Sequence, residues 1–284
     1  MNYRHTYHAG NFADVVKHAV LALIVRHLTK KDAPFRYLDT HAGIGAYDLQ
    51  GDEASRTGEW REGAGRLWDM PLAADAEALL APWRDAVGKL NPDGALRYYP
   101  GSPEIVRGLA RANDRLTLCE LHPEDAARLR WRYGREKRVT VVEIDGYSAL
   151  NAYLPPKERR GCVLTDPPFE EAGEFRRMTE GLQRAHAKWP GGTYALWYPI
   201  KDVMETDGFL RNVGKAGIPS ILTGELFLTR PNDPSRLNGC GLIVVNPPFT
   251  LAQDLKVLLP ALAERLGRDG GARGRVIEVA PEKL

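Results

Sequence analysis

The stretch from 161 to 169, GCVLTDPPF, indicates the fold of this 284-residue chain more clearly than any other. An apolar run this short, closed by an acid and two prolines, is typical of a buried strand that ends in a stiff loop. Proline has no N–H, so Pro167 and Pro168 cannot extend the strand. Asp166 is therefore expected at the carboxyl end of a buried strand, where α/β sheets bind their ligands.

Six further apolar runs of the same kind flank this one along the chain. They lie at 35–39, 116–120, 139–144, 193–198, 222–228 and 241–246. Helical patterns alternate with them, at 13–28, 123–133 and 175–189. Strands that alternate with helices predict an α/β fold with a seven-stranded, mostly parallel sheet. The glycine-rich end of the chain is compatible with one more short strand or with a loose tail.

The interval between the first two strands is too long for a single crossover helix. It contains two mostly helical patterns, at 59–68 and 75–90. We predict that residues 46–95 form a small helical insertion. Residues 1–45 and 96–284 would then form a Rossmann-like domain.

Three strand ends carry features that are typical of a nucleoside site. The loop Asp39–Gly45 (DTHAGIG) has two glycines, but Asp48 replaces the third glycine of a dinucleotide fingerprint, and no P-loop lysine follows. Glu120 ends the second strand, where a carboxylate can accept from ribose hydroxyls. An acid at Asp145, before Gly146, can accept from an adenine amino group. Together they predict S-adenosylmethionine, a cofactor without a pyrophosphate, although tight turns and helix-cap acids would also explain each feature alone.

The loop at Asp166 predicts the chemistry. The amino group of adenine is a poor nucleophile because its lone pair is delocalised into the ring. Asp166 and the carbonyl of Pro167 can each accept one N–H, which aims the lone pair at a sulfonium methyl. Phe169 can stack on a base that has left its helix. We therefore expect Asp166 to be catalytic, with Pro167 and Phe169 binding an adenine.

A second copy of this pattern, Asn246–Phe249 (NPPF), follows the run at 241–246. Asparagine could also accept a hydrogen bond from an amino group. Chain order favours Asp166, because the cofactor loop comes first, the two acids next, and the base-binding motif on the fourth strand. We expect Asn246 to lie at the far side of the sheet and to be structural.

Composition and charge restrict the function only weakly. The formal net charge is +2, and basic clusters at 128–138 and 157–160 are compatible with a solvated surface or with RNA binding. No apolar run reaches the roughly 18 residues of a membrane span, and we see no signal peptide. We expect a cytoplasmic, monomeric protein without a membrane partner. Buried free thiols are expected at all three cysteines: Cys119, Cys162 and Cys240.

The chain resembles the family of bacterial ribosomal large-subunit RNA methyltransferases J, which methylate N6 of an adenine in 23S rRNA. The resemblance rests on YRHTYHAGNFADVVKH at the N-terminus, YLDTHAGIGAY, RTGEW, LRYYPGSP, ELHP, DG at Asp145, DPPF, YALWYP and NPPF. These stretches run to near residue 249 and so cover most of the chain. The resemblance implies a class I methyltransferase that acts on rRNA free of ribosomal proteins or early in assembly.

By position, the resemblance places cofactor contacts at His18, His41, Gly43, Ser102, Glu120, Asp145, Gly146 and Asp166. It places Tyr3 and His5 on a segment that closes over the active site, and Lys17 near the entrance for cofactor or substrate. Phe169 departs from the tyrosine of a relative, which removes a hydroxyl but keeps a stacking ring. No metal is expected, because methyl transfer to nitrogen needs none and the N-terminal histidines lack a metal-ligand spacing.

Three other functions remain as alternatives. A DNA adenine methyltransferase would share the motif at Asp166, although such enzymes usually carry a larger target-recognition domain. The incomplete glycine fingerprint disfavours a nicotinamide-dependent oxidoreductase. The intact Asp166, Glu120 and glycine loop disfavour a non-catalytic RNA-binding protein of the same fold. The sequence leaves open which adenine is modified, and whether RNA is held by the basic segment after Glu120 or by the arginines of the insertion: Arg56, Arg61 and Arg66.

Overall fold

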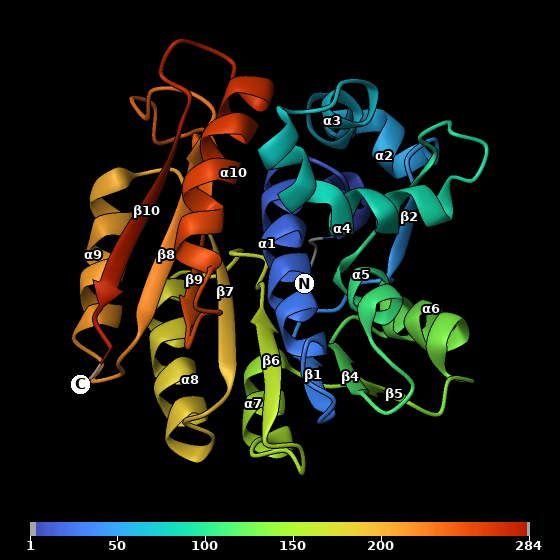
Figure 1. Cartoon of the computed structure of the whole chain (residues 1–284), viewed down its shortest axis with the longest axis vertical. Coiled ribbons are helices and arrows are strands. Elements are labelled where there is room, and N and C mark those ends of the chain that lie inside the picture. Colours follow the sequence, from blue (N-terminus) through green and yellow to red (C-terminus); the bar gives the residue numbers. More distant parts are fainter. Residues whose placement is uncertain (1–3, 283–284) are drawn as a thin grey trace.

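A central sheet of eight strands organises the computed structural model, which describes residues 4–282 (Figure 1). The strands follow the order β10-β8-β9-β7-β6-β1-β4-β5. They are β1 (Phe35–Asp39), β4 (Arg115–Glu120), β5 (Val139–Glu143), β6 (Arg160–Thr165), β7 (Thr193–Ile200), β8 (Ile221–Phe227), β9 (Gly239–Val245) and β10 (Arg273–Ala280).

Strand direction divides the sheet into two parts. β5, β4, β1, β6 and β7 pair in parallel, whereas β9 is antiparallel to both β7 and β8, and β10 is antiparallel to β8. The chain leaves β1 toward β4 and β5 and then returns to β6 on the other side. This reversal of strand order opens a crevice at the carboxyl ends of β1 and β6, which is where such sheets bind ligands.

The mostly parallel α/β sheet is confirmed, with two corrections. The sheet has eight strands rather than seven, because 273–280 forms β10 instead of a loose tail. Only Ala280 of that strand is buried, so its apolar pattern is weak, and pairing with β8 defines it. β9 lies between β7 and β8 rather than at the far side of the sheet. Every residue of β9 is buried, and an interior position covers both of its faces.

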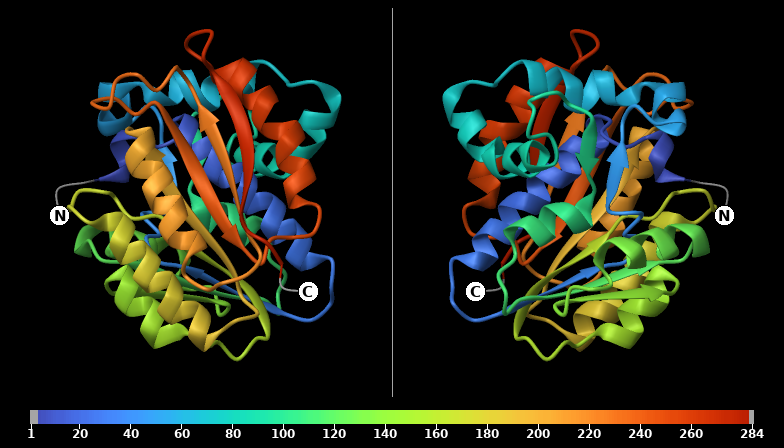
Figure 2. Two further views of the ribbon diagram at one scale, coloured as in Figure 1. Left: turned by 90° about the vertical axis from the view of Figure 1, so that its left-hand side faces the viewer. Right: turned by 90° about the vertical axis from the view of Figure 1, so that its right-hand side faces the viewer.

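Helices cover both faces of the sheet (Figure 2). One face packs against α1 (Phe12–Thr29), α5 (Ser102–Leu109), α6 (Pro123–Tyr133) and α10 (Leu251–Leu266). The other packs against α7 (Gly146–Tyr153), α8 (Glu174–Lys188) and α9 (Val203–Gly214). The helical patterns predicted at 13–28, 123–133 and 175–189 are confirmed as α1, α6 and α8. A side-chain cap, Asn11 accepting from the N–H of Asp14, begins α1.

The segment between β1 and α5 packs on α1. It contains β2 (Ala46–Asp48), α2 (Asp52–Thr57), a π-helix (Arg61–Gly65), α3 (Arg66–Asp69), α4 (Ala74–Leu90) and β3 (Tyr98–Pro100). β2 and β3 pair with each other as an antiparallel ribbon. Leu80 and Trp83 are fully buried in the same apolar cluster as α1. A Cβ at Gly63 would lie 2.3 Å from the carbonyl oxygen of Gly10, so this close contact requires glycine.

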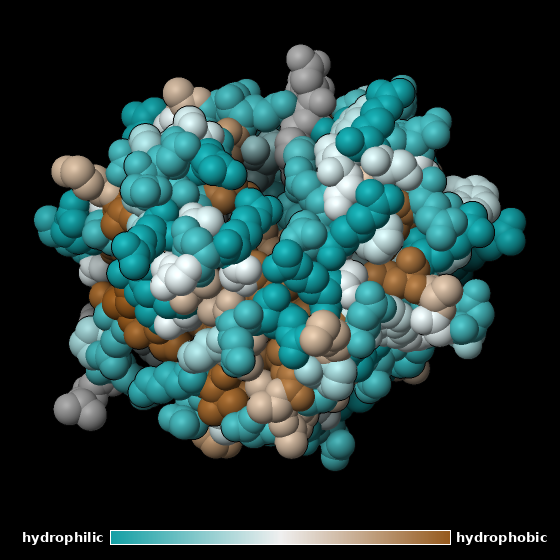
Figure 3. All heavy atoms as spheres, turned by 90° about the horizontal axis from the view of Figure 1, so that it is seen from above, coloured by the Kyte–Doolittle hydropathy of each residue, from teal (hydrophilic) through white to brown (hydrophobic). Residues whose placement is uncertain are grey.

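The cysteines and the surface agree with a globular protein. All three cysteines are free and buried, as predicted. Seen from above, the surface is mostly hydrophilic, with small separated apolar patches (Figure 3). Within residues 4–282, no helix is both long and apolar enough to cross a membrane.

Candidate active site

A cleft of about 690 Å³ opens at the carboxyl ends of the parallel strands. It falls within the usual size range of small-molecule sites. The structure brings twelve of the thirteen predicted site residues to its walls, whereas Tyr3 lies outside the described residues. The twelve are His5, Lys17, His18, His41, Gly43, Ser102, Glu120, Asp145, Gly146, Asp166, Pro167 and Phe169.

The loop after β1 is shaped by Asp39 and Gly43. The buried Asp39 carboxylate accepts hydrogen bonds from the hydroxyls of Tyr37 at 2.7 Å and Ser102 at 2.6 Å. Burial raises the pKa of Asp39 to about 6, although both hydrogen bonds oppose the rise. Gly43 has a φ of +60°, and a Cβ there would lie 2.2 Å from the hydroxyl of Tyr47. The loop therefore bends tightly and leaves its backbone open to the cleft.

Glu120 is held in place by backbone N–H groups at the end of β4. Its carboxylate accepts from Gly43 N at 2.9 Å and from His122 N at 2.8 Å. Burial raises the pKa of Glu120, and the two N–H groups oppose that effect. His122 lines the same wall, and its buried Nδ1 has no hydrogen-bond partner within residues 4–282. An oriented carboxylate beside an unpaired ring nitrogen suits a polar ligand such as a ribose.

The residues after β5 complete this part of the cleft. The Asp145 carboxylate accepts from Ser148 N at 2.8 Å and so caps α7, which leaves its second oxygen for a ligand. A Cβ at Gly146 would lie 2.6 Å from the ring of His41, so only glycine fits there. Burial lowers the pKa of His41, which keeps the ring neutral near pH 7. The residues at the ends of β1, β4 and β5 thus fit a nucleoside cofactor in both shape and hydrogen-bonding groups.

Asp166 belongs to a chain of charged groups that reaches the N-terminal segment. Lys17 Nζ lies 2.5 Å from one oxygen of Asp166 and 2.8 Å from one oxygen of Asp14. The other oxygen of Asp14 is 2.8 Å from Nε2 of His5 and also accepts from Gly10 N. Residues 149 positions apart in the chain, Lys17 and Asp166, therefore form an ion pair inside the cleft.

The ion pairs decide the charge states in this chain of groups. Burial would raise the pKa of Asp14, but His5 and Lys17 hold it well below its ordinary value. Burial would also lower the pKa of Lys17, but Asp14 and Asp166 keep it well above its ordinary value. Lys17 is thus an ammonium ion that occupies one oxygen of Asp166 and leaves the other to accept from a substrate. Sequence reasoning missed Asp14, whose only signal was its position one turn before Lys17.

Aromatic side chains form the wall beside Asp166. The ring of Phe169 packs edge-on against Phe175 at 5.3 Å and Trp197 at 5.8 Å between centroids. Phe169 has a φ of +54°, a backbone conformation that non-glycine residues rarely adopt. Sequence reasoning placed Trp197 in a strand but did not assign it to the site. The cleft continues past it to Lys201, Ser235 and Leu237.

His18 is almost completely buried in the wall of the cleft. Its Nδ1 is 3.0 Å from the hydroxyl of Tyr99, and burial lowers the pKa of the ring well below its ordinary value. His18 is therefore neutral near pH 7. Within residues 4–282, no group of three or more His, Cys, Asp or Glu side chains could hold a metal ion.

The ends of β1, β4 and β5 carry groups that suit a nucleoside, and the end of β6 carries a carboxylate. This arrangement defines the class of the protein, which is a Rossmann-like class I methyltransferase dependent on S-adenosylmethionine. The family model described as "Ribosomal RNA large subunit methyltransferase D, RlmJ" matches residues 32–278. The chain belongs to this family of ribosomal RNA large-subunit methyltransferases.

Relatives and a solved structure match nearly the whole chain. Two curated proteins named ribosomal RNA large subunit methyltransferase J, from Escherichia coli and Haemophilus influenzae, are each 41% identical over 283 residues. Each match spans 99% of this chain and 100% of the relative. The crystal structure of protein LPL1258 from Legionella pneumophila is similar with a TM-score of 0.86 and 35% identity, over 95% of this chain and 98% of that one.

Proposed function

We propose that this protein transfers a methyl group from S-adenosylmethionine to the N6 amino group of an adenine in 23S rRNA. One observation supports the adenine-N6 part above others: the Asp166 loop lies in the cleft with one carboxylate oxygen paired to Lys17 and the other available. An aromatic ring, Phe169, stands next to that carboxylate on the same loop. Both features suit a planar base that carries an amino group.

The residues of the cleft would have different roles in the reaction. S-adenosylmethionine supplies an electrophilic methyl group when it is bound. Asp166 accepts one N–H of the adenine and the Pro167 carbonyl accepts the other, which turns the nitrogen lone pair toward the methyl group. Lys17 holds the Asp166 carboxylate in one orientation. As the N–C bond forms, the nitrogen becomes acidic and its proton passes to the free oxygen of Asp166 or to water.

The cofactor residues would bind the two ends of the nucleoside. Glu120 accepts from the ribose hydroxyls, and the free oxygen of Asp145 accepts from the adenine amino group of the cofactor. Ser102 already donates its hydroxyl proton to Asp39, so it can offer a ligand only its oxygen or its backbone. His5, on the N-terminal segment, would help to close the site over the substrate, and Lys17 would lie near the entrance, because Asp14 links His5 to Lys17 and Lys17 pairs with Asp166.

The names of the relatives support large-subunit rRNA as the acceptor. We propose that the acceptor is rRNA free of ribosomal proteins or at an early stage of assembly. The enzyme would act as a monomer in the bacterial cytoplasm, and residues 46–95 would form an insertion in a Rossmann-like domain. DNA adenine methylation is the second candidate, because the Asp166 loop alone does not distinguish a deoxyribose from a ribose.

The experiment is methyl transfer from labelled S-adenosylmethionine to protein-free 23S rRNA, followed by nucleoside digestion and mass spectrometry. We expect N6-methyladenosine, and we expect it to vanish with Asp166→Ala while the variant remains folded. A DNA duplex of matched sequence is the parallel acceptor. Label that enters the DNA and not the RNA would overturn the rRNA assignment, and label on another atom would overturn the role of Asp166.

A further inference from the structure

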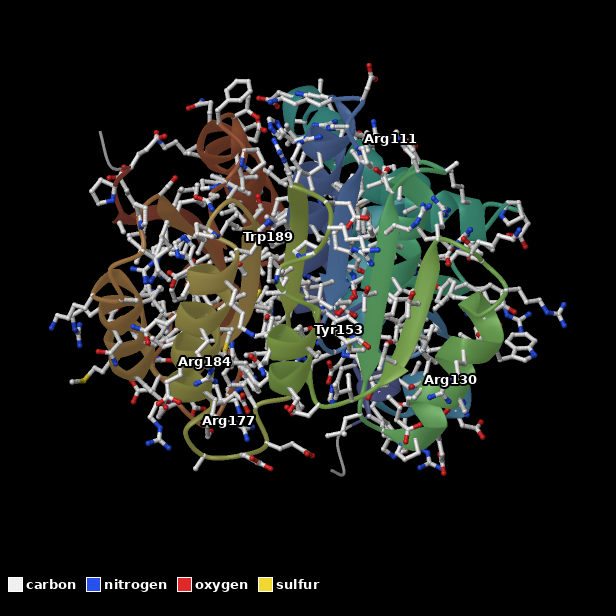
Figure 4. All side chains as sticks on the ribbon, turned by 90° about the horizontal axis from the view of Figure 1, so that it is seen from below. Arg111, Arg130, Tyr153, Arg177, Arg184 and Trp189 are labelled. Carbon is white, nitrogen blue, oxygen red and sulfur yellow. The ribbon has the colours of Figure 1, made fainter. Side chains whose placement is uncertain are left out.

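The outer face of α6 and the turn that follows it carry four exposed residues that the active site does not use. Arg128, Trp131 and Arg132 follow the spacing i, i+3 and i+4, which brings side chains to one side of a helix, and Arg135 lies in the turn that follows the last helical residue, Tyr133. We call this set the α6 stripe. The indole of Trp131 is 84% exposed, whereas Leu129 and Tyr133 turn into the core. Figure 4 shows α6 at the periphery of the molecule beside β5, with Arg130 on it.

The arginines of the α6 stripe have little local counter-charge, because Glu104, which attracts Arg132, is itself paired with Arg107. Within residues 4–282, Arg128, Arg132 and Arg135 form no ion pair, because the nearby acids are engaged elsewhere. Arg4 binds Glu124 and Asp125 in the first turn of α6. The other two acids of this region are also paired: Glu143 with Arg130, and Glu136 with Arg107 and Arg138. An exposed aromatic ring among unpaired guanidinium groups is a surface suited to a polyanion that has π-faces.

The helical segment at 46–95 has the opposite charge. It contains ten acidic and five basic residues, a formal net charge of −5, whereas 121–138 contains three acidic and six basic residues, a net charge of +3. Arg66 is paired with Glu62, and Arg61 lies over the ring of its neighbour Trp60. Phosphate binding depends on uncompensated positive charge, so the α6 stripe suits RNA better than this segment does.

The α6 stripe also begins next to the active site. Leu121 and His122 line the cleft, and α6 starts at the following residue. At about 1.5 Å per helical residue, Trp131 lies about 13 Å along the helix from that wall. Nucleotides adjacent to a base in the cleft could therefore extend along α6.

We propose that the α6 stripe is the docking surface for the RNA substrate. Its arginines bind phosphates that flank the adenine in the active site, and Trp131 stacks on an unpaired base. This inference rests on the proposed rRNA methyltransferase function. The partner is thus RNA with at least one unpaired base near the target, rather than an uninterrupted duplex.

The first test removes the three charges of the α6 stripe. A triple variant with Arg128→Ala, Arg132→Ala and Arg135→Ala is compared with a matched triple on distant helices, Arg211→Ala, Lys215→Ala and Lys256→Ala. We expect the α6 variant to bind protein-free 23S rRNA at least about 10-fold more weakly, with a slope of log affinity against log salt reduced by about 2 to 3. Cofactor affinity and melting temperature should match those of the wild type. Equal weakening by both triples, or no weakening by the first, would overturn the proposal.

The second test separates stacking from charge. Trp131→Ala is expected to lower rRNA affinity about 10-fold without changing the salt slope, and Trp131→Phe to restore most of it. Met204→Ala, at an 82% exposed apolar residue on α9, is the matched control and should have no effect. Loss of affinity with Phe as well as Ala, or no loss with Ala, would rule out stacking.

A failure of the proposed function can be distinguished from a failure of the α6 proposal by the acceptor that is methylated. If the wild type binds rRNA through α6 but methylates only DNA, the acceptor assignment falls. A fluorescent DNA duplex and an RNA stem-loop, tested in parallel by anisotropy, then judge the α6 stripe alone. If Arg128→Ala, Arg132→Ala and Arg135→Ala weaken the duplex as much as the stem-loop, the RNA-specific role is wrong.

Discussion

Two loops of nearly identical sequence, Asp166–Phe169 and Asn246–Phe249, lie at opposite ends of the strands of the same sheet. Each follows a buried strand and contains Pro-Pro-Phe. Because β6 is parallel to β1, the loop after β6 opens into the cleft. Because β9 runs antiparallel to β7, the loop after β9 emerges at the opposite end of the strands. The direction of the preceding strand, and not the tetrapeptide, places a loop at the active site.

The side chains of the two loops have correspondingly different partners. Asp166 faces Lys17 in the cleft. Asn246 instead donates its amide hydrogens to the carbonyls of Pro190 and Gly192, at 2.7 and 2.8 Å. Phe169 belongs to an aromatic wall, but Phe249 is 84% exposed. Through these two hydrogen bonds, the side chain of Asn246 closes the turn between α8 and β7.

The largest expected effect comes from exchanging the first residue of each loop. Asp166→Asn converts the first loop to the sequence of the second and should lower kcat at least about 100-fold, because the amide is a weaker acceptor that carries no charge. The reciprocal Asn246→Asp should leave kcat unchanged. Methylation of rRNA, with melting temperature as the folding control, measures both. A variant with Asp166→Asn that keeps a tenth of the wild-type rate would contradict the comparison.

A smaller effect should appear in the pH dependence of stability, because Asp39 is buried beside the cleft. Burial raises the pKa of this carboxyl to about 6, so its contribution to stability is complete below pH 4 and is lost as the pH rises through 6. Asp39→Asn lacks this ionisation. Between pH 4 and 8 the free energy of unfolding of the wild type should therefore fall by about 3 kcal/mol relative to the variant. Parallel urea-unfolding curves at several pH values test it, and a constant difference would show that Asp39 does not titrate there.

In the second loop, Asn246→Ala should lower the stability of the protein and leave its activity unchanged. It removes two hydrogen bonds to carbonyls and puts alanine at a φ of +49°, which together should lower the free energy of unfolding by about 2 kcal/mol. Asn246→Gly relieves the backbone strain and should recover part of the loss. Chemical denaturation measures stability, and initial rates measure activity. A drop in kcat at unchanged KM would show that this loop reaches the active site after all.

The smallest effect is expected for the second phenylalanine. Phe169→Ala should lower kcat/KM for rRNA roughly 10-fold, since a stacked base contributes about 1–3 kcal/mol. Phe249→Ala should change neither the rate nor, beyond about 0.5 kcal/mol, the stability. Phe169→Tyr keeps the ring and should keep most of the activity. Similar losses from both alanine variants would remove the distinction between the loops.

Local sequence determined most of the strands and the acids that follow them. A buried strand needs a short apolar run and a turn residue after it, and both are visible without the rest of the molecule. Glu120, Asp145 and Asp166 could be placed together because parallel strands present their carboxyl ends at one edge. The resemblance to a family added His5, Lys17 and His18, for which the local pattern alone indicated nothing specific.

Only the tertiary structure decided how distant segments meet. The position of β9 between β7 and β8, and the existence of β10, depend on which partners bury each strand. The link from His5 through Asp14 and Lys17 to Asp166 joins residues up to 161 positions apart in the chain, and no local pattern encodes that contact. Likewise, Trp131 reads as one more apolar residue in a helical segment, and only its place on the open face of α6 makes it available to a partner. Local structure follows from short-range sterics and apolar spacing, whereas long-range pairing follows from burial, which requires the whole fold.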